Sequence, residues 1–272
     1  MYGILVIGAP GAGKSTFCTG LSDIFSQLKR EFCIFNLDPA NDNNEYDAHF
    51  DIKELITVEE VMERLELGPN GALKYCIETL CRNPEWLIEK ILANKQKYII
   101  IDCPGQLELY KSEGELWRVI RKLESAGVRL CALHLADSLY CSDASKFISV
   151  VMSTLSTMVT LEMPQVNVLS KIDLFDRNAS FNLEYFLQLP DISKLLEMLN
   201  DVPGLDRYQA LNNAICQVIS DFDLVNFLPL DVRKKESMAQ IIKAIDTANG
   251  YALVEQEGDI RDMVLTQSTH ES

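Results

Sequence analysis

The chain has 272 residues, of which 47% are hydrophobic and 24% are charged, enough apolar sequence to bury one large core or two small ones. Its formal net charge of -15 argues against a protein that grips nucleic acid through the phosphate backbone, because such binding needs clustered Lys and Arg. The eight cysteines form no C-x-x-C pair and only three histidines are present. Reduced, buried thiols are therefore expected and a zinc cluster is not.

The amino-terminal stretch MYGILVIGAPG enters a predicted strand at once. It lacks the basic start and long apolar stretch of a signal peptide, so we expect a protein of the cytoplasm, with shuttling to the nucleus as an option. The longest low-charge segment, residues 147–163, is shorter than the roughly 20 residues of a membrane span. A buried or interface helix is expected there.

Short apolar, β-branched runs recur along the chain between helical patterns. Runs that are apolar on both faces and separated by helices are typical of a parallel sheet covered on both sides. The predicted fold class is therefore α/β, with one domain over residues 1–251 and a short helical or disordered tail over 252–272. The expected strands, in chain order, cover residues 3–8, 32–38, 98–102, 129–137, 165–173 and 227–231.

The segments between these runs predict helices with recognisable boundary signals. Thr57 and Glu60 have the spacing of a capping box, and Gly68 with Pro69 is expected to stop the helix that they start. The expected helices begin at Lys14, Thr57, Ala72 and Pro84, and the first of them ends at Arg30.

The most specific motif is GAPGAGKST, which fits G-x-x-x-x-G-K-[ST] directly after a predicted strand and before a predicted helix. The glycines of such a loop let backbone N–H groups wrap phosphates at the start of a helix. The lysine neutralises the outer phosphates, and the hydroxyl after it can ligate magnesium. The expected nucleotide-binding residues are Gly11, Ala12, Gly13, Lys14, Ser15 and Thr16.

Two carboxylates are expected where strands of this sheet end beside the phosphates. Asp38 lies in NLDPAN and Asp102 opens DCPGQLE. Because ligands in open α/β sheets bind at the carboxyl ends of the strands, both are candidate magnesium and catalytic residues together with Ser15. The alternative for Asp38 is a cap of the turn before Pro39.

The loop after Asp102 carries further candidates. Gly105 completes a D-x-x-G element whose backbone N–H could reach the terminal phosphate. Gln106 and Glu108 follow on the same loop and could orient an attacking water, as hydrolysis of a phosphoanhydride demands. A solvated surface charge is the alternative for Glu108.

The base is expected to be read by SKID at the end of the fifth strand. The carboxylate of Asp173 can accept hydrogen bonds from guanine N1–H and its exocyclic amine, and the stem of Lys171 can cover the ring. After the last strand, the backbone N–H of Leu230 could reach the guanine carbonyl, although a plain strand exit explains that stretch equally well.

A Gly-Pro-Asn-Gly turn over residues 68–71 interrupts the helical region. Phosphoryl transfer usually needs a further group that meets the developing charge, yet no arginine stands in this loop context and no lysine follows Gly8 directly. Pro69 stiffens the turn and Asn70 offers amide donors and an acceptor. The turn is therefore a candidate for the segment that brings a polar side chain, Asn70, to the developing charge.

Together with this P-loop, the motifs NLDPAN, LGPNG, DCPGQLELY and SKID resemble the GPN-loop GTPases, a SIMIBI-class family of P-loop GTPases named for the motif at Gly68-Pro69-Asn70. The resemblance runs from about Tyr2 to Tyr251. The segment HLADSLYCSDASKFISV is most similar to the second of three eukaryotic paralogues. One departure is Ser170, where many GTPases carry Asn or Thr, which puts nucleotide affinity but not base identity in question.

The resemblance implies a three-layer P-loop NTPase fold with a mainly parallel sheet and helical insertions, and GTP or GDP with Mg²⁺ as ligands. It implies a dimer in which each subunit inserts its loop toward the partner's phosphates. Asn70 would then complete the facing site, Asp38 and Gln106 would position or activate water, and Glu108 would assist. The implied partners are a second copy or a GPN-loop paralogue, and subunits or assembly factors of RNA polymerase II, with no direct binding to nucleic acid or membrane.

Two other functions stay open at this point. A P-loop kinase would consume ATP and pass phosphate to an acceptor. A non-enzymatic interaction module would keep its nucleotide as a structural ligand.

Overall fold

The computed structural model describes residues 1–41, 46–110, 114–175, 196–197, 199–200, 206–222 and 225–253. The expected tail helix after Tyr251 lies outside them, apart from its first residues. Within the described residues, the strands form a single seven-stranded parallel sheet in the order β3-β2-β4-β1-β5-β6-β7. The strands are β1 (Tyr2–Gly8), β2 (Phe32–Asn36), β3 (Phe50–Asp51), β4 (Tyr98–Asp102), β5 (Arg129–Asp137), β6 (Gln165–Ser170) and β7 (Leu228–Pro229).

All six expected strands are present, and the parallel α/β class is confirmed. Three of them end earlier than expected, at Asn36, Ser170 and Pro229. The seventh strand, β3, was not predicted from the sequence because a two-residue strand carries no periodicity.

The central strand β1 lies between β4 and β5. Its pairing aligns Val6 with Asp102 and Gly8 with Leu135. The carboxyl ends of these strands therefore meet at one edge of the sheet, where ligands of open α/β sheets bind.

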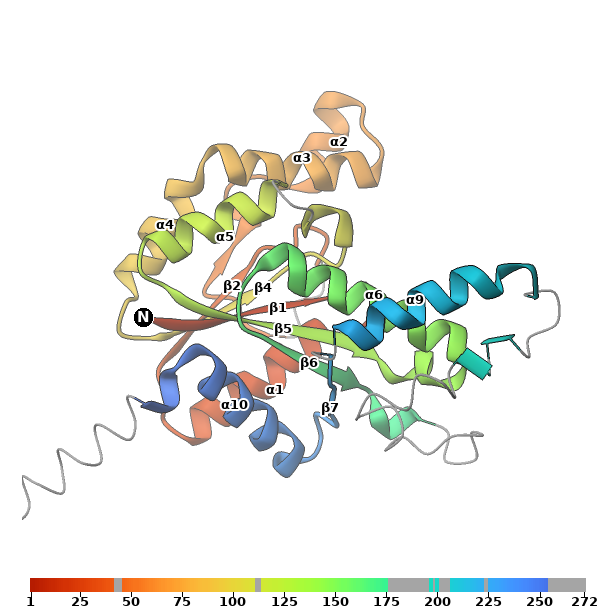
Figure 1. Ribbon diagram of the computed structural model, residues 1–272. Coiled ribbons are helices and arrows are strands. Elements are labelled where there is room, and N and C mark those ends of the chain that lie inside the picture. Colours follow the sequence, from red (N-terminus) through yellow and green to blue (C-terminus); the bar gives the residue numbers. More distant parts are fainter. Residues whose placement is uncertain are drawn as a thin grey trace, which may run out of the picture.

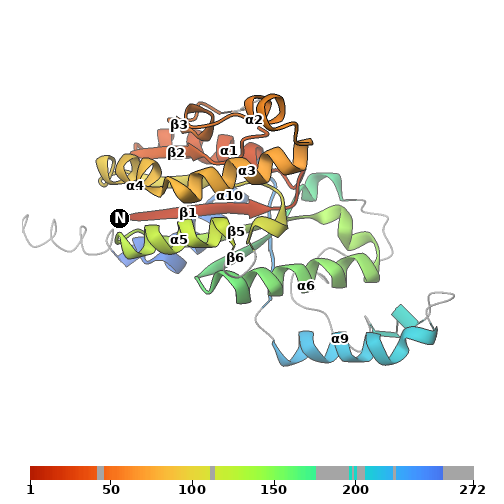
Figure 2. The ribbon, with the colours of Figure 1, turned by 90° about the horizontal axis from the view of Figure 1, so that it is seen from above.

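Helices cover both faces of the sheet and make the three expected layers (Figure 1, Figure 2). On one face α1 and α10 bury Phe17, Leu21 and Ile241 against the strands, and on the other α3, α4 and α5 form a second core. The helices α6 and α9 enclose a third cluster beside β6. Their bounds are α1 (Lys14–Gln27), α2 (Val58–Leu65), α3 (Pro69–Arg82), α4 (Pro84–Ala93), α5 (Glu115–Ser125), α6 (Ala144–Leu161), α9 (Gln209–Asp221) and α10 (Lys235–Asn249).

Two helix boundaries differ from the prediction. The first helix ends at Gln27 rather than Arg30, because Lys29 takes a left-handed backbone conformation with φ 55°. The helix expected to resume near Ala72 already begins at Pro69. A proline at the first helical position loses no hydrogen bond, since that N–H has no partner within the helix. Gly68-Pro69 thus starts α3, and α2 ends before it at Leu65.

The apolar segment predicted to be a buried or interface helix is α6. By length and composition alone it is the one helix among the described residues that could cross a membrane, with 44% of it buried in the fold. Phe147, Val151 and Leu155 pack into the third cluster, which confirms a core helix.

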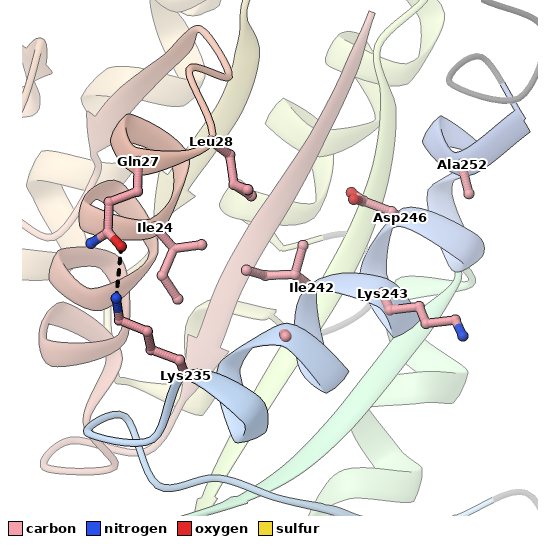
Figure 3. Close-up of a pocket in the computed structure, with 9 residues that line it drawn as sticks. Ile24, Gln27, Leu28, Lys235, Ile242, Lys243, Asp246 and Ala252 are labelled. Atoms are coloured by element: carbon pink, nitrogen blue, oxygen red, sulfur yellow. Dashed lines mark hydrogen bonds between the residues drawn. The ribbon is translucent and has the colours of Figure 1, made fainter. Parts of the chain in front are cut away.

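A groove of about 410 Å³ separates α1 from α10 on the face opposite α3 to α5. Its walls carry Ile24 and Leu28 from α1 and Ile242 from α10, and Lys235 donates to the side chain of Gln27 across one end (Figure 3). The groove lies away from the P-loop, and none of the predicted site residues lines it.

Candidate nucleotide site

The P-loop has the conformation that an anion cradle requires. Gly11 and Gly13 have left-handed φ values of 76° and 91°, and the space where a side chain would stand at either residue is open. Lys14 is buried at the start of α1, and its Nζ donates to the carbonyl of Gly8 at 3.3 Å. The loop therefore presents its backbone and an ammonium group to one space, as phosphate binding demands.

A pocket of about 640 Å³ opens above this loop. It brings together segments far apart in the sequence: the P-loop, the loop after β2, the start of α3 and the loop after β4. The predicted site residues in its lining are Gly11, Gly13, Lys14, Ser15, Thr16, Asp38, Pro69, Asn70, Gly105, Gln106 and Lys171. Ala12 is buried beneath the loop, with its carbonyl bonded to Ser170.

Asp102 lies under the pocket at the end of β4, and its side chain is almost fully buried. Its Oδ2 accepts hydrogen bonds from Ser15 Oγ at 3.2 Å and from Tyr46 Oη at 2.7 Å. Burial raises the pKa of Asp102 to about 6, while the bond from Tyr46 and the charge of Lys14 act to lower it. Oδ1 has no hydrogen-bond partner among the described residues.

Asp38 forms the turn cap that the sequence offered as an alternative, while its predicted magnesium and catalytic role stays a prediction. Its Oδ1 accepts from the backbone N–H of Ala40 at 3.1 Å, which makes it a turn residue. It also lines the pocket. The turn at Pro39 therefore holds the carboxylate toward the phosphate space.

The loop after β4 passes directly over the P-loop. A side chain at Gly105 would come within 2.8 Å of Pro10 N, so only glycine fits here. Gln106 Nε2 donates to Asn70 Oδ1 at 3.0 Å. The Gly-Pro-Asn turn thus faces the pocket of its own chain. The predicted role of Glu108 stays untested, because its side chain lies outside the described part of the structure.

The expected base-reading residues lie at the end of β6. Lys171 has a left-handed backbone, and its Nζ pairs with Asp137 at 2.8 Å. Asp173 lies outside the pocket lining and pairs with the exposed Arg233 at 3.4 Å. The N–H of Leu230 donates to the carbonyl of Leu169 at 2.8 Å. Leu230 is therefore a strand exit in this arrangement, and its predicted contact with guanine is not supported.

Ser170 forms a link that sequence reasoning did not anticipate. Its hydroxyl lies 2.7 Å from the carbonyl of Ala12 in the P-loop and 3.1 Å from that of Ala136 on β5. The residue that departs from the common GTPase pattern thus ties the end of β6 to the phosphate loop.

Two other residues at the site were also missed. Asn41 lines the pocket, and its amide donates to Ser15 Oγ at 3.2 Å. Tyr46 holds Asp102 from below. Asn41 could have been found from its place in NLDPAN, whereas nothing in the sequence around Tyr46 singles it out.

The chain is similar to known proteins over nearly its whole length. Residues 6–251 match the family described as "Conserved hypothetical ATP binding protein". GPN-loop GTPase 2 of Danio rerio is 44% identical over 258 residues, which cover 94% of this chain and 83% of the relative. The GPN-loop GTPase 2 homologue of Dictyostelium discoideum is 42% identical and covers 92% of this chain and 80% of the relative. The chain belongs to the GPN-loop GTPase family.

The predicted enzyme class is thereby confirmed at the level of the family. Both relatives carry the name of the second paralogue, as the resemblance in the sequence predicted. An apo crystal structure of a GTPase from Pyrococcus abyssi has the same fold, with a TM-score of 0.75 at 22% sequence identity. The match covers 91% of this GPN-loop chain and 97% of the Pyrococcus abyssi chain.

Proposed function

We propose that this protein binds GTP in the 640 Å³ pocket and hydrolyses the bond between its β- and γ-phosphates. The observation that carries the proposal is the convergence of Lys14, Gly105 and Gln106 on one space. Lys14 would neutralise the outer phosphates, and the Gly105 N–H would donate to the terminal one. Gln106 donates one of its two amide N–H groups to Asn70, and its amide oxygen is the group that would accept a hydrogen bond from the attacking water.

Magnesium is part of this proposal, and the residues fit the ion. Ser15 offers a hydroxyl, and Asp102 carries one buried oxygen without a hydrogen-bond partner in the described part of the chain. No cluster of three or more His, Cys, Asp or Glu side chains suited to a metal occurs among the described residues. That suits Mg²⁺, which usually takes few protein ligands and completes its shell with phosphates and water. When bound, it would neutralise charge on the phosphates, and the residues that would hold it are Ser15, Asp102 and Asp38.

Base choice is tested by exchanging the proposed guanine acceptor. Asp173→Asn should lose GTP affinity and gain affinity for xanthosine triphosphate, because the asparagine amide can donate to the xanthine carbonyl that replaces the guanine amine. Equilibrium binding of GTP, ATP and xanthosine triphosphate to both proteins measures this. Because the matched family model carries an ATP-binding description, tighter binding of ATP than GTP by the wild type would favour the kinase alternative instead.

We also propose that hydrolysis is completed in a dimer through the Gly-Pro-Asn turn. The turn stands at the rim of the pocket and presents Asn70. Asn70→Ala should leave GTP binding nearly intact and slow phosphate release by about tenfold or more, since preorganised polar groups act mainly on the transition state. Asn83→Ala removes an exposed asparagine from the far end of the same helix and serves as control.

The concentration dependence of turnover tests the dimer separately. Turnover per chain should rise with protein concentration over the range in which sedimentation shows pairing, either with itself or with a paralogue. A rate that is constant across that range would argue for a complete site in one chain. Retention of bound GTP without any phosphate release, even in the dimer, would favour a structural nucleotide.

We propose that this protein has the cellular role implied by its resemblance to the GPN-loop GTPases. It would act as a switch in the assembly of RNA polymerase II, in the cytoplasm and nucleus. Its support is membership of the family alone. Depletion of the protein should leave the large polymerase subunits in the cytoplasm, and the Asp173→Asn form should fail to restore their import. Normal nuclear polymerase after depletion would refute this role.

A further inference from the structure

Tyr46 is a buried residue that touches the site and that the proposed reaction does not use. It follows β2 on the way to β3 and is only 5% exposed. Its ring belongs to the cluster formed by Phe17 and Leu21 of α1 and the strands beneath them. A buried tyrosine hydroxyl needs a polar partner, and this one donates to Asp102 Oδ2 at 2.7 Å.

The hydroxyl completes a continuous chain of hydrogen bonds below the phosphate space. Asn41 donates to Ser15 Oγ at 3.2 Å, and Ser15 donates to Asp102 Oδ2 at 3.2 Å. Tyr46 donates to the same oxygen from the opposite end of the chain. The two donors fix the orientation of a carboxylate that is only 1% exposed.

The two oxygens of Asp102 are thereby made different. Oδ2 receives both hydrogen bonds, while Oδ1 receives none from the described residues. If the phenol were absent, Ser15 would be the single side-chain donor to Asp102 among the described residues, and the carboxylate could turn toward another arrangement. Residues behind a metal ligand commonly set metal affinity in this way by orienting it.

We propose that Tyr46 is a positioning residue that holds Asp102, and through it the Ser15 hydroxyl, in the geometry that binds the magnesium ion of the nucleotide complex. This inference rests on the proposed function, because it assigns Tyr46 to the magnesium site described there. The role belongs to the hydroxyl and not to the ring, since phenylalanine would fill the same apolar space.

The experiment compares Tyr46→Phe with Tyr98→Phe. Tyr98 is the matched control: it lies in the same buried cluster and its hydroxyl also has a buried polar partner, the amide of Asn249 at 2.7 Å, but it is remote from the site. Full-length proteins loaded with a nonhydrolysable GTP analogue are titrated with Mn²⁺ and followed by electron paramagnetic resonance. Unfolding temperatures and affinity for the analogue in EDTA are measured alongside.

Tyr46→Phe should bind Mn²⁺ about tenfold more weakly or worse, with nucleotide affinity in EDTA unchanged. Its GTP turnover should recover as Mg²⁺ is raised. Tyr98→Phe should bind Mn²⁺ as the wild type does. Incorporation of p-aminophenylalanine at position 46 restores an N–H donor on the same ring and should recover most of the affinity.

Wild-type Mn²⁺ affinity in a folded Tyr46→Phe protein would overturn the inference and leave Tyr46 as a packing residue. A p-aminophenylalanine protein as weak as Tyr46→Phe would also overturn it. If the wild type itself binds no Mn²⁺ with the analogue, the magnesium part of the proposed function fails instead, so the two failures can be told apart.

Discussion

At the scale of single residues, Gly105 in the loop after β4 packs tightly against the P-loop. A Cβ atom there would lie 2.8 Å from Pro10 N and 3.0 Å from Lys14 Nζ. Gly105→Ala should therefore push the P-loop out of place and lower GTP affinity by about tenfold or more, since overpacking costs about 1 to 3 kcal/mol. Titration with a fluorescent GTP analogue measures the change.

Gly71→Ala is the matched control for that substitution. Its Cβ would meet Leu67 at 3.6 Å, an ordinary contact, near the same rim of the pocket. It should keep wild-type affinity. Equal losses in the two variants would show that close packing at Gly105 is not the cause.

His134 on β5 predicts a pH dependence of stability. It is buried against Thr154, and desolvation lowers its pKa from 6.5 to about 4. The unfolded chain binds more protons between these values, so the contribution of His134 to stability is complete above pH 6.5 and is lost as the pH falls toward 4.

Between pH 7 and 5 the loss due to His134 should be about 2 kcal/mol, and His134→Gln should not show it. Urea unfolding of both proteins at the two pH values measures the difference. The raised pKa of Asp102 acts in the opposite sense, but it is present in both proteins and cancels. If His134→Gln loses as much stability between pH 7 and 5 as the wild type does, His134 is not the cause of the loss.

Residue identities in the site were predictable where the chemistry is local. Lys14, Ser15 and Gly105 belong to short motifs whose spacing fixes their role. Tyr46 was not predictable, because its contact with Asp102 spans 56 positions and depends on how the β2–β3 connection returns over the sheet.

At the scale of elements, a buried ion pair joins the connection between α1 and β2 to α10. Arg30 pairs with Asp246 at 2.8 Å, with side chains 11% and 7% exposed, and its guanidinium stacks on the ring of Tyr251. Asp246→Ala should destabilise the protein by about 3 to 5 kcal/mol, because it leaves a buried charge without its partner. Chemical denaturation gives the value.

The double substitution Arg30→Met with Asp246→Leu tests the cause of that loss. Replacing both charges by apolar groups removes the uncompensated charge, so much of the lost stability should return. If the double variant is as unstable as Asp246→Ala, the stability is lost through altered packing around position 246 and not through the unpaired charge of Arg30.

Most helices and strands could be predicted from hydrophobic periodicity, but the residues at which they begin and end could not. The sequence predicts the helix over Pro69–Arg82 three residues late, because Gly-Pro is typical of a helix stop, whereas proline at the first helical position starts a helix here. The two-residue strand β3 exists through its pairing with β2, and such pairing leaves no pattern in the sequence.

At the scale of the whole molecule, the reactivity of the buried cysteine side chains measures how often the core is exposed to solvent. All eight are free thiols, and only Cys81 is partly exposed. Burial raises the pKa of Cys33 to about 11 and that of Cys141 to about 12, so few reactive thiolates form at neutral pH.

Iodoacetamide should therefore modify Cys81 first in the native protein, and all eight cysteines only after unfolding in guanidinium. Intact mass and peptide mapping count the adducts. Cys81→Ser should remove the fast adduct. Rapid native labelling at Cys18 or Cys103 would mean that the core opens far more often than its burial implies.

The order of the strands in the sheet could not be predicted from the sequence alone. Alternating helices and apolar runs predict a parallel sheet, but the position of β1 between β4 and β5 depends on which non-local contacts are best, and periodicity contains no information about them. The location of the nucleotide pocket was nevertheless predictable, because the P-loop and the loops with motifs after β2, β4 and β6 all leave strands at the same edge.

The contact between Asn70 and Gln106 has a consequence for any pairing of two chains. The side chain at this tip carries one carboxamide, which accepts from Gln106 of its own chain at 3.0 Å. This bond engages only the amide oxygen, and it leaves the two N–H donors of the same carboxamide out of the contact. In the proposed pair of chains, each Asn70 would therefore offer its donors to the facing phosphates while its oxygen stays bonded to Gln106 of its own chain.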